Sequence, residues 1–193
     1  MRPTVRFLGD ELVEQIIAEA RGILDKLGVE IHNDGILAML ADYGAKVDAG
    51  KKRAYLSDVI IDKALETAPA SFKLYDVLGR QTHDFSGDTV YFTPGSAAIN
   101  VLDHDTGQIR TPTTGDYVRY VKVVSQLDYI ASQSTALIPG DVHQNVSDSY
   151  RLFLSLMFCE KPVVTGTFTI DAFNIMRDLQ LAVRGNKKEL KNT

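Results

Sequence analysis

Regular spacing of apolar residues predicts four secondary-structure elements in the first 80 residues. Apolar positions recur at steps of three and four in three segments, as on one face of an α-helix, and alternate in a fourth, as in a strand. The predicted helices cover residues 9–28, 33–44 and 57–69, and the predicted strand covers residues 71–77. The first helix has the clearest pattern, because Leu12, Ile16 and Ile23 share a face and Gly28 stands where a C-terminal cap belongs.

From about residue 80, short and nearly continuous apolar runs alternate with amphipathic helices. Strands are predicted over residues 88–103, 129–139 and 161–169, and helices over residues 113–127, 147–160 and 171–185. Near-continuous apolar strands are typical of parallel sheets covered by helices. An open doubly wound sheet and a (β/α) barrel both satisfy this α/β pattern. The expected organisation is a helical α+β region over residues 1–80 and βα units over residues 81–193.

The composition narrows the class of protein. The 193 residues are 45% apolar and 24% charged, with a formal net charge of −4, which is ordinary for a globular domain in water. Basic residues are interspersed with acidic ones, so no nucleic-acid partner is expected. The apolar runs are much shorter than the ~20 residues that cross a bilayer, so no membrane association is expected either.

Cysteine usage and the first residues bear on the compartment. Cys159 is the only cysteine, which allows no internal disulfide and fits a reducing environment. It lies in the apolar run of a predicted helix, where a buried, inert thiol is expected. The opening "MRPTVRFLGDE" has no apolar run of the kind found in signal peptides. The expected location is the cytoplasm.

The tripeptide Asp105-Thr106-Gly107 is the one that carries the catalytic aspartate of aspartic proteases. Two such aspartates share a proton in those enzymes, and the tripeptide follows a hydrophobic strand. Here it follows polar residues and occurs once, so a protease would have to be a symmetric dimer. The same residues suit a turn, with a capping carboxylate and a glycine free to take positive φ. We therefore predict a hairpin tip before a short strand over residues 109–113, with the protease as the alternative.

Metal-binding patterns are weak in this sequence. Asp103, His104 and Asp105 are consecutive, so they cannot all face one ion on a regular strand. Asp141 and His143 are two apart and could share a face, but they are only two ligands. The His-Glu-x-x-His and Cys-x-x-Cys spacings are absent, as are dinucleotide and Walker glycine loops. We predict no metal site.

Ligands in parallel α/β folds bind at the carboxyl ends of the strands. Those ends fall at residues 93–97, 136–143 and 164–169, which are rich in glycine, hydroxyl groups and backbone donors. Asp141 is the one well-placed carboxylate among them. These segments suit the wall of a pocket for a small polar ligand, although glycine turns with threonine caps would have the same composition.

Several ordered motifs resemble one known family. The segments "FLGDELVEQIIAEARGILDKLGVEI", "ADYGAKVD" and "APASFKLYD" are followed by "YFTPGSAAINVLDHDTGQIRTPTTGDYVRYVKVVSQLDYI" and "EKPVVTGTF". In this order they resemble the trimethylamine methyltransferase family of corrinoid-dependent methyltransferases, which includes glycine betaine methyltransferases. The resemblance covers essentially the whole chain.

The resemblance implies a (β/α)8 TIM-type barrel preceded by a small N-terminal α+β region. It also implies transfer of a methyl group from a methylated or quaternary amine, of the trimethylamine or glycine betaine type, to the cobalt of a corrinoid. The corrinoid (cobalamin) would be carried by a partner protein and not bound directly by this chain.

Such a pocket must hold a cation, usually with aromatic faces and carboxylates, and align it with cobalt. No catalytic residue is assigned. The residues expected at the substrate are Tyr91, Phe92, Ser96, Asp141, His143, Thr165 and Thr167.

Members of this family are much longer, and a complete barrel needs ~250 residues. The chain is therefore expected to be an N-terminal portion with the first few βα units of a partial barrel, inactive alone. An open sheet edge and uncovered helix faces would favour a homo-oligomer or pairing with the missing part. The alternative function is a non-catalytic module that docks a corrinoid carrier.

Overall fold

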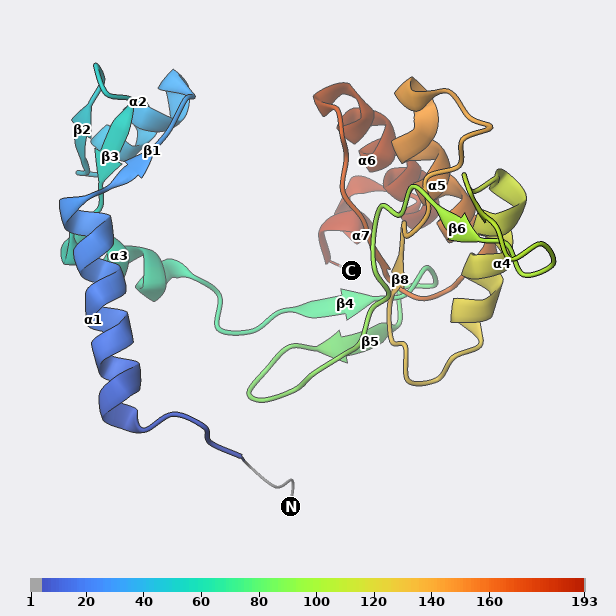
Figure 1. The fold of residues 1–193 in the computed structure, drawn as a ribbon, viewed down its shortest axis with the longest axis horizontal. Coiled ribbons are helices and arrows are strands. Elements are labelled where there is room, and N and C mark those ends of the chain that lie inside the picture. The colour runs from blue at the N-terminus through green and yellow to red at the C-terminus, as the bar shows by residue number, and fades with distance from the viewer. Residues whose placement is uncertain (1–4, 193) are drawn as a thin grey trace. The chain divides into compact units, whose positions relative to one another are not determined.

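The computed structural model of this chain describes residues 5–192 and forms two compact units, divided between Pro69 and Ala70 (Figure 1). The predicted boundary between residues 80 and 81 falls instead beside a hairpin turn inside the second unit. Each unit has its own sheet and helices, and each is described separately below.

The first unit contains three helices and a small antiparallel sheet. Its helices are α1 (Asp10–Lys26), α2 (Asp34–Asp42) and α3 (Asp58–Thr67), and its strands are β1 (Val29–Glu30), β2 (Lys46–Asp48) and β3 (Arg53–Tyr55). The strand order is β1-β3-β2. The three helices predicted from apolar periodicity are confirmed. The strands are two or three residues long, too short to show an alternating pattern.

Gly28 makes the connection from α1 to this sheet possible. Its φ is +70°, which L side chains rarely adopt, and a Cβ placed there would lie 2.5 Å from the carbonyl oxygen of Ala54. Its amide donates to the carbonyl of Ile23 at 3.0 Å, which ends the helix. Glycine is therefore required both for the helix end and for the close approach of β3.

The second unit begins with the antiparallel hairpin of β4 (Lys73–Tyr75) and β5 (Gln81–Asp84). Asp76 shapes its turn, because one carboxylate oxygen accepts the amides of Leu78 and Arg80 at 2.9 and 2.8 Å. Stacked and tilted aromatic contacts join this hairpin to the residue that opens the next strand. They involve Phe72, His83, Phe85 and Tyr91.

Three parallel segments follow, with helices between them. Phe92 and Ala98 form parallel bridges to Ile130 and Leu137. Further along, β8 (Gln133–Ser134) pairs in parallel with β9 (Val163–Val164). The helices are α4 (Thr114–Ser125), α5 (Gln144–Phe158), α6 (Ile170–Arg184) and α7 (Lys187–Asn192). Parallel pairing with a helix in each crossover confirms the predicted strand–helix alternation, while the barrel stays a prediction, because residues 5–192 contain no closed sheet.

Two details of the second unit differ from the sequence prediction. Helix α5 begins at Gln144, three residues before the predicted start, because His143 is its N-cap and the polar "QNVSD" turn hides the helical period. The extended segment predicted over residues 88–103, which "TPGS" interrupts, forms only two isolated bridges, at Phe92 and Ala98, and the short β6 (Val101–Leu102). β6 then pairs with β7 (Ile109–Arg110).

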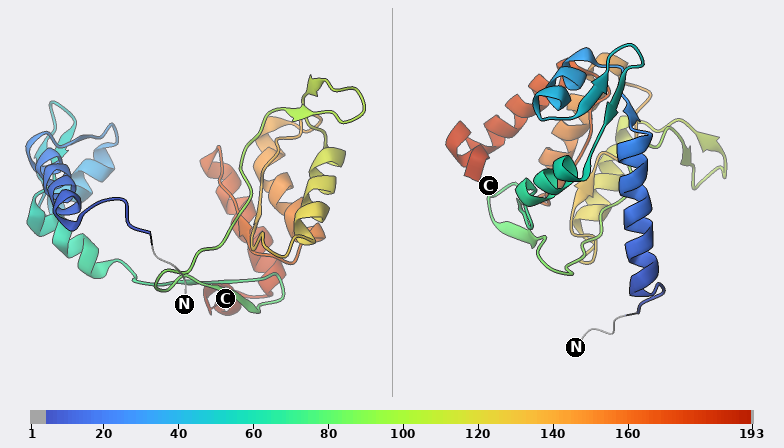
Figure 2. Two further views of the ribbon diagram at one scale, coloured as in Figure 1. Left: turned by 60° about the horizontal axis from the view of Figure 1, so that its bottom comes forward. Right: turned by 90° about the vertical axis from the view of Figure 1, so that its left-hand side faces the viewer.

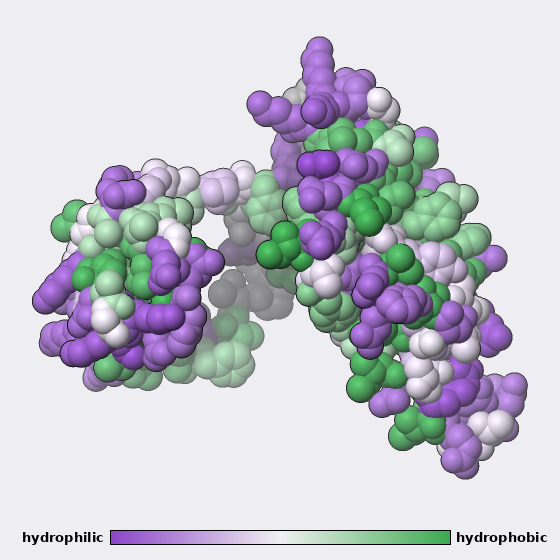
Figure 3. Space-filling model, turned by 90° about the horizontal axis from the view of Figure 1, so that it is seen from above, coloured by the Kyte–Doolittle hydropathy of each residue, from purple (hydrophilic) through white to green (hydrophobic). Residues whose placement is uncertain are grey.

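The core of the second unit lies between its helices and the parallel segments. Tyr117, Val121, Leu154 and Cys159 form a buried cluster, and α4, α5 and α6 lie side by side (Figure 2). The predicted burial of Cys159 is confirmed. Many other apolar side chains remain at the surface of both units, among hydrophilic ones (Figure 3). In residues 5–192 no helix combines the length and the apolarity needed to cross a bilayer.

Candidate functional site

The carboxyl ends of the parallel strands bring two of the predicted residues into one polar cluster. Just after β8, the buried hydroxyl of Thr135 lies 3.0 Å from that of Thr165, which follows β9. This placement follows from parallel pairing, since the carboxyl ends of neighbouring strands meet at one edge of the sheet. Thr167 comes two residues later, in the loop that leads to α6.

A buried ion pair on α5 contacts this cluster. The guanidinium of Arg151 donates to the carboxylate of Asp148 at 2.6 Å, and the two side chains are only 2% and 4% exposed. Another nitrogen of Arg151 donates to the carbonyl of Thr135 at 2.9 Å. The guanidinium also lies over the ring of Phe168, 5.4 Å from its centroid. Arg151 therefore joins α5 to the ends of two different strands.

Asp148 ties down the loop after β9. Its second carboxylate oxygen accepts the hydroxyl of Thr167 at 3.1 Å and the amide of Phe168 at 2.6 Å. With Arg151 on its other oxygen, the carboxylate is fully engaged. Asp148 is thus a positioning group, and it is not free to act as a general base.

Asp141 and His143 lie beyond β8 and cap helices. The carboxylate of Asp141 accepts the amide of Thr114 at 2.9 and 3.1 Å and its hydroxyl at 3.2 Å, at the start of α4. A carboxylate is stabilised there by the helix dipole. The ring of His143 accepts the amide of Asn145 at 3.2 Å in the first turn of α5. Both predicted site residues are therefore held by helix N-termini.

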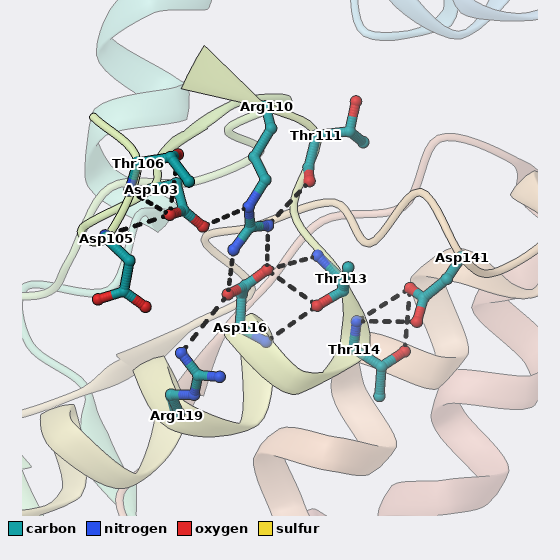
Figure 4. A network of polar contacts seen from close by, with 10 residues as sticks. All are labelled: Asp103, Asp105, Thr106, Arg110, Thr111, Thr113, Thr114, Asp116, Arg119 and Asp141. Carbon is teal, nitrogen blue, oxygen red and sulfur yellow. Dashed lines mark hydrogen bonds and ion pairs between the residues drawn. The ribbon is translucent and has the colours of Figure 1, made fainter. Parts of the chain in front are cut away.

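The hairpin of β6 and β7 is fastened to α4 by Arg110 (Figure 4). Its guanidinium donates to Asp103 at 2.7 Å and, with two nitrogens, to Asp116 at 2.6 and 3.0 Å. The hydrogen bond from Arg110 lowers the pKa of Asp103 to about 2 and holds the pKa of Asp116 below its usual range. Asp116 also completes the capping box of α4 with Thr113.

The same network settles how the Asp105-Thr106-Gly107 turn is built. The two strands pair in antiparallel register on either side of it, and Gly107 has φ +65°, so the predicted hairpin tip is confirmed. The capping carboxylate is that of Asp103, which accepts the amides of Asp105 and Thr106. Asp105 is exposed at the tip and far from the buried, paired geometry of a protease dyad.

Tyr91, Phe92 and Ser96 belong to the first parallel segment, but they do not all lie at its carboxyl end. The hydroxyl of Tyr91 accepts the amide of Asp84 at 2.9 Å, and its ring lies 4.3 Å from that of His83, at the amino end of the segment. Phe92 forms the first bridge and is 64% exposed. Ser96 alone lies near the carboxyl end, and it is exposed.

The amino ends of the strands carry groups that the sequence did not single out. His83 is buried between the hydroxyls of Thr82 and Ser132, at 2.8 and 3.0 Å, and burial lowers its pKa. The ammonium of Lys161 donates to the carbonyls of Val124, Leu127 and Ile130 at 2.7 to 2.8 Å, closing the end of α4. The lysine of the Lys-Pro pair before β9 therefore has a structural role.

The most buried site groups were also absent from the predicted residues. Asp148 and Arg151 stand three apart on a helix, the spacing of an ion pair on one face. That spacing was visible in the sequence, but most such pairs are exposed, and burial could not be inferred from it. In the part of the chain that is described, no three His, Cys, Asp or Glu side chains gather as a metal site would require.

The arrangement can bind and orient a ligand without acid–base chemistry. Both carboxylates near the strand ends, Asp141 and Asp148, already accept hydrogen bonds from the protein. The hydroxyl of the partly exposed Thr165 and the exposed ring of Phe168 are what remain for a ligand, while the buried Thr135 supports Thr165 from the neighbouring strand. Such a surface suits a reaction whose nucleophile is brought from outside.

Family comparison decides the relationship that the motifs suggested. The family described as trimethylamine methyltransferase (MTTB) matches residues 1–192. The chain belongs to this family.

Individual relatives agree with the family match. A glycine betaine methyltransferase of Desulfitobacterium hafniense (strain Y51) is 27% identical over 82% of this chain and 33% of its own length. An L-carnitine:corrinoid methyltransferase of Eubacterium limosum is 28% identical over 81% of this chain and 32% of its own. A trimethylamine methyltransferase of D. hafniense (strain DSM 10664 / DCB-2) is 20% identical over 94% of this chain and 37% of its own. The chain thus spans about a third of the length of the curated relatives it matches.

Proposed function

We propose that this chain takes part in methyl transfer from a methylated or quaternary amine to the cobalt of a corrinoid held by a separate carrier protein. The observation that carries the proposal is the family match over residues 1–192. The names of the relatives support the chemical class, since they act on glycine betaine, on L-carnitine with a corrinoid, and on trimethylamine.

We further infer that the parallel segments are the first βα units of a (β/α)8 barrel. Two parallel bridges and the parallel pair of β8 and β9, each with a helix in the crossover, support this inference. In such barrels the active site is formed at the carboxyl ends of the strands. The Thr135–Thr165 cluster lies at that end, and the Lys161 and His83 contacts lie at the other.

The reaction explains why the cluster can work without a free acid or base. The methyl group leaves the amine nitrogen, which keeps the electron pair of the broken C–N bond, and Co(I) of the corrinoid supplies the pair for the new bond. The protein must hold the cation, exclude water and align carbon with cobalt. Carboxylates and hydroxyls of the protein that hydrogen bonds hold in fixed positions suit this task.

Phe168 is the aromatic side chain we assign to the cation. One face of its ring meets Arg151, while 67% of the residue remains exposed at the end of β9. An aromatic face attracts a methylated ammonium group. We assign the hydroxyls of Thr165 and Ser96, at the carboxyl ends of β9 and of the first parallel segment, to complete such a pocket.

Methyl transfer to free cob(I)alamin tests the proposal. Because this chain is expected to be inactive alone, the full-length protein would be mixed anaerobically with cob(I)alamin and, in turn, trimethylamine, glycine betaine and L-carnitine, and methylcobalamin formation would be followed by absorbance. Methylcobalamin should form with at least one amine. Failure with every amine of this panel would refute the function, including the proposed docking of substrate.

A pair of matched variants tests the site. Phe168→Leu should raise the KM for the amine about fivefold or more, because it removes a cation–π contact of ~1 kcal/mol or more. Tyr129→Leu removes a ring that is 91% exposed beyond α4, at the amino ends of the strands. It should leave KM unchanged. Equal effects of the two variants would contradict the placement of the pocket.

A further inference from the structure

The β6–β7 hairpin has a fixed base. Arg110 bridges Asp103 in the hairpin and Asp116 in α4 through three hydrogen bonds of 2.6 to 3.0 Å. A two-nitrogen contact with one carboxylate fixes orientation as well as distance. Asp116 in turn caps α4 with Thr113, and Asp141 holds the next residue of that helix. The hairpin is therefore held in one direction relative to the strand ends.

The two faces of the hairpin differ in chemistry. Val101 pairs with Arg110 on the face that meets α4, and both are partly buried. Leu102 pairs with Ile109 on the opposite face, and these residues are 67% and 73% exposed. A cross-strand pair places two apolar side chains in contact. A rigid support thus presents an apolar pair to the solvent.

The position of the hairpin relates it to the strand ends. It follows Ala98 directly, and Ala98 is paired with the β8 segment through hydrogen bonds to Ala136 and Ile138 of 2.6 and 2.9 Å. In both views of Figure 2 the hairpin extends beyond the helices of its unit. It therefore stands at the carboxyl end of the first parallel segment.

The charges around the hairpin favour a basic partner over a second copy of this chain. The residues drawn in Figure 4 include four aspartates and two arginines, which gives this group a formal charge of −2. Within residues 5–192 the carboxylate of Asp105, at the tip, has no hydrogen-bond or ion-pair partner, and it points away from the network (Figure 4). A second copy of the chain would bring an equal negative charge to a symmetric contact, which opposes pairing through this surface.

We propose that the outer face of the β6–β7 hairpin, made by Leu102, Ile109 and Asp105, docks the corrinoid carrier protein through an apolar and basic surface of that protein. The proposal rests on the proposed function, because the carrier must approach the carboxyl ends of the strands to accept the methyl group. The hairpin has a contact role, and the residues of the substrate pocket remain separate from it.

Binding measurements with a defined panel test this docking surface. The probes are purified, cobalamin-loaded corrinoid proteins of D. hafniense and E. limosum, the sources of the relatives. At least one should bind the wild-type chain. The double variant Leu102→Thr/Ile109→Thr should weaken that binding about tenfold or more, as expected for a central apolar contact. Asp105→Lys, which changes only an exposed tip residue, should also weaken binding and reduce its dependence on salt.

Val90→Thr is the matched control, because Val90 is also a β-branched apolar residue and is 69% exposed, but it precedes the first parallel segment. It should bind like the wild type. Binding that no hairpin variant changes, or the absence of any binding by the wild type, would overturn the proposal. So would a loss of self-association in the hairpin variants, seen by sedimentation, without a loss of carrier binding.

A second assay separates this proposal from the proposed function. Methyl transfer by the full-length protein to free cob(I)alamin needs no carrier, so the hairpin variants made in that protein should match the wild type there while losing transfer to the carrier-bound corrinoid. Absence of transfer to free cob(I)alamin by the wild type would refute the function. Equal loss with both acceptors in the hairpin variants would refute the docking surface alone.

Discussion

Two arginine–aspartate clusters in the second unit use the same chemistry in different surroundings. Arg151 and Asp148 lie on one helix and are almost wholly buried, at 2% and 4% exposure. Arg110 joins a hairpin to a helix, and its side chain is 37% exposed. Burial removes solvent screening, so the loss of one partner costs far more in the first cluster than in the second. The buried pair holds the unit together, and the exposed network orients one projecting element.

Breaking the buried pair should have the largest effect. Arg151→Met leaves the carboxylate of Asp148 buried without its cation, and the free energy of unfolding should fall by ~3–5 kcal/mol. Urea unfolding followed by circular dichroism measures it. The double variant Arg151→Met/Asp148→Leu should lose less than the single one, because no charge is then left unpaired. A double variant less stable than Arg151→Met would contradict this account.

Lys161 is an intermediate case, because its partly buried ammonium meets carbonyls and not a carboxylate. Lys161→Met should lower the free energy of unfolding by ~2 kcal/mol, the scale of hydrogen bonds to a charged group. Thermal or urea unfolding measures this loss. The exposed Lys122→Met in α4 is the control and should change little. Similar losses for both lysines would show that the three carbonyl contacts carry no special weight.

Removing Arg110 from the exposed network should affect only the hairpin and its turn. Arg110→Met should leave global unfolding nearly unchanged, since exposed ion pairs are screened by water. It should increase hydrogen exchange at the amides of Asp105 and Thr106, which depend on the turn held by Asp103. Exchange in α5 should stay as in the wild type. A global loss as large as that of Arg151→Met would remove the distinction between the two clusters.

The smallest expected effect is a change in the pKa of Asp103 when Arg110 is replaced. Its pKa is lowered from 3.8 to about 2, first by the hydrogen bond from Arg110. A lowered pKa in the folded state means that the ionised form stabilises it, so this contribution is complete above pH 3.8 and is lost as the pH falls toward 2. NMR of the side-chain carboxyl carbon follows the titration. In Arg110→Met the midpoint should rise toward 3.8, and an unchanged midpoint would exclude Arg110 as the main cause.

The strand–helix alternation could be predicted because it depends on local patterns. Helix α1 shows its apolar face and its terminal glycine, and α4 shows the Thr113 cap. The hairpin tip was visible too, since Gly107 follows polar residues between short extended runs. Its capping residue was not, because Asp103 and Asp105 are chemically equal, and only the turn geometry selects Asp103.

The roles of the predicted site residues depended on contacts that sequence does not reveal. Asp141 looked like a free carboxylate, but its partner Thr114 lies 27 residues away at the start of another helix. Thr135, which meets Thr165, lies inside a predicted apolar strand and carried no signal of its own. In both cases a contact between residues far apart in the sequence determines the role of the side chain. Their part in substrate binding stays a prediction.

The most direct measurement of the central claim is a crystal structure of the protein with glycine betaine bound. We expect the trimethylammonium group to lie against the ring of Phe168, at the carboxyl ends of β8 and β9. This expectation would be contradicted by betaine bound only in the cleft of about 240 Å³ that Lys73, Leu152 and Arg184 help to line, since that cleft lies on the side of the β4–β5 hairpin and away from the threonine hydroxyls.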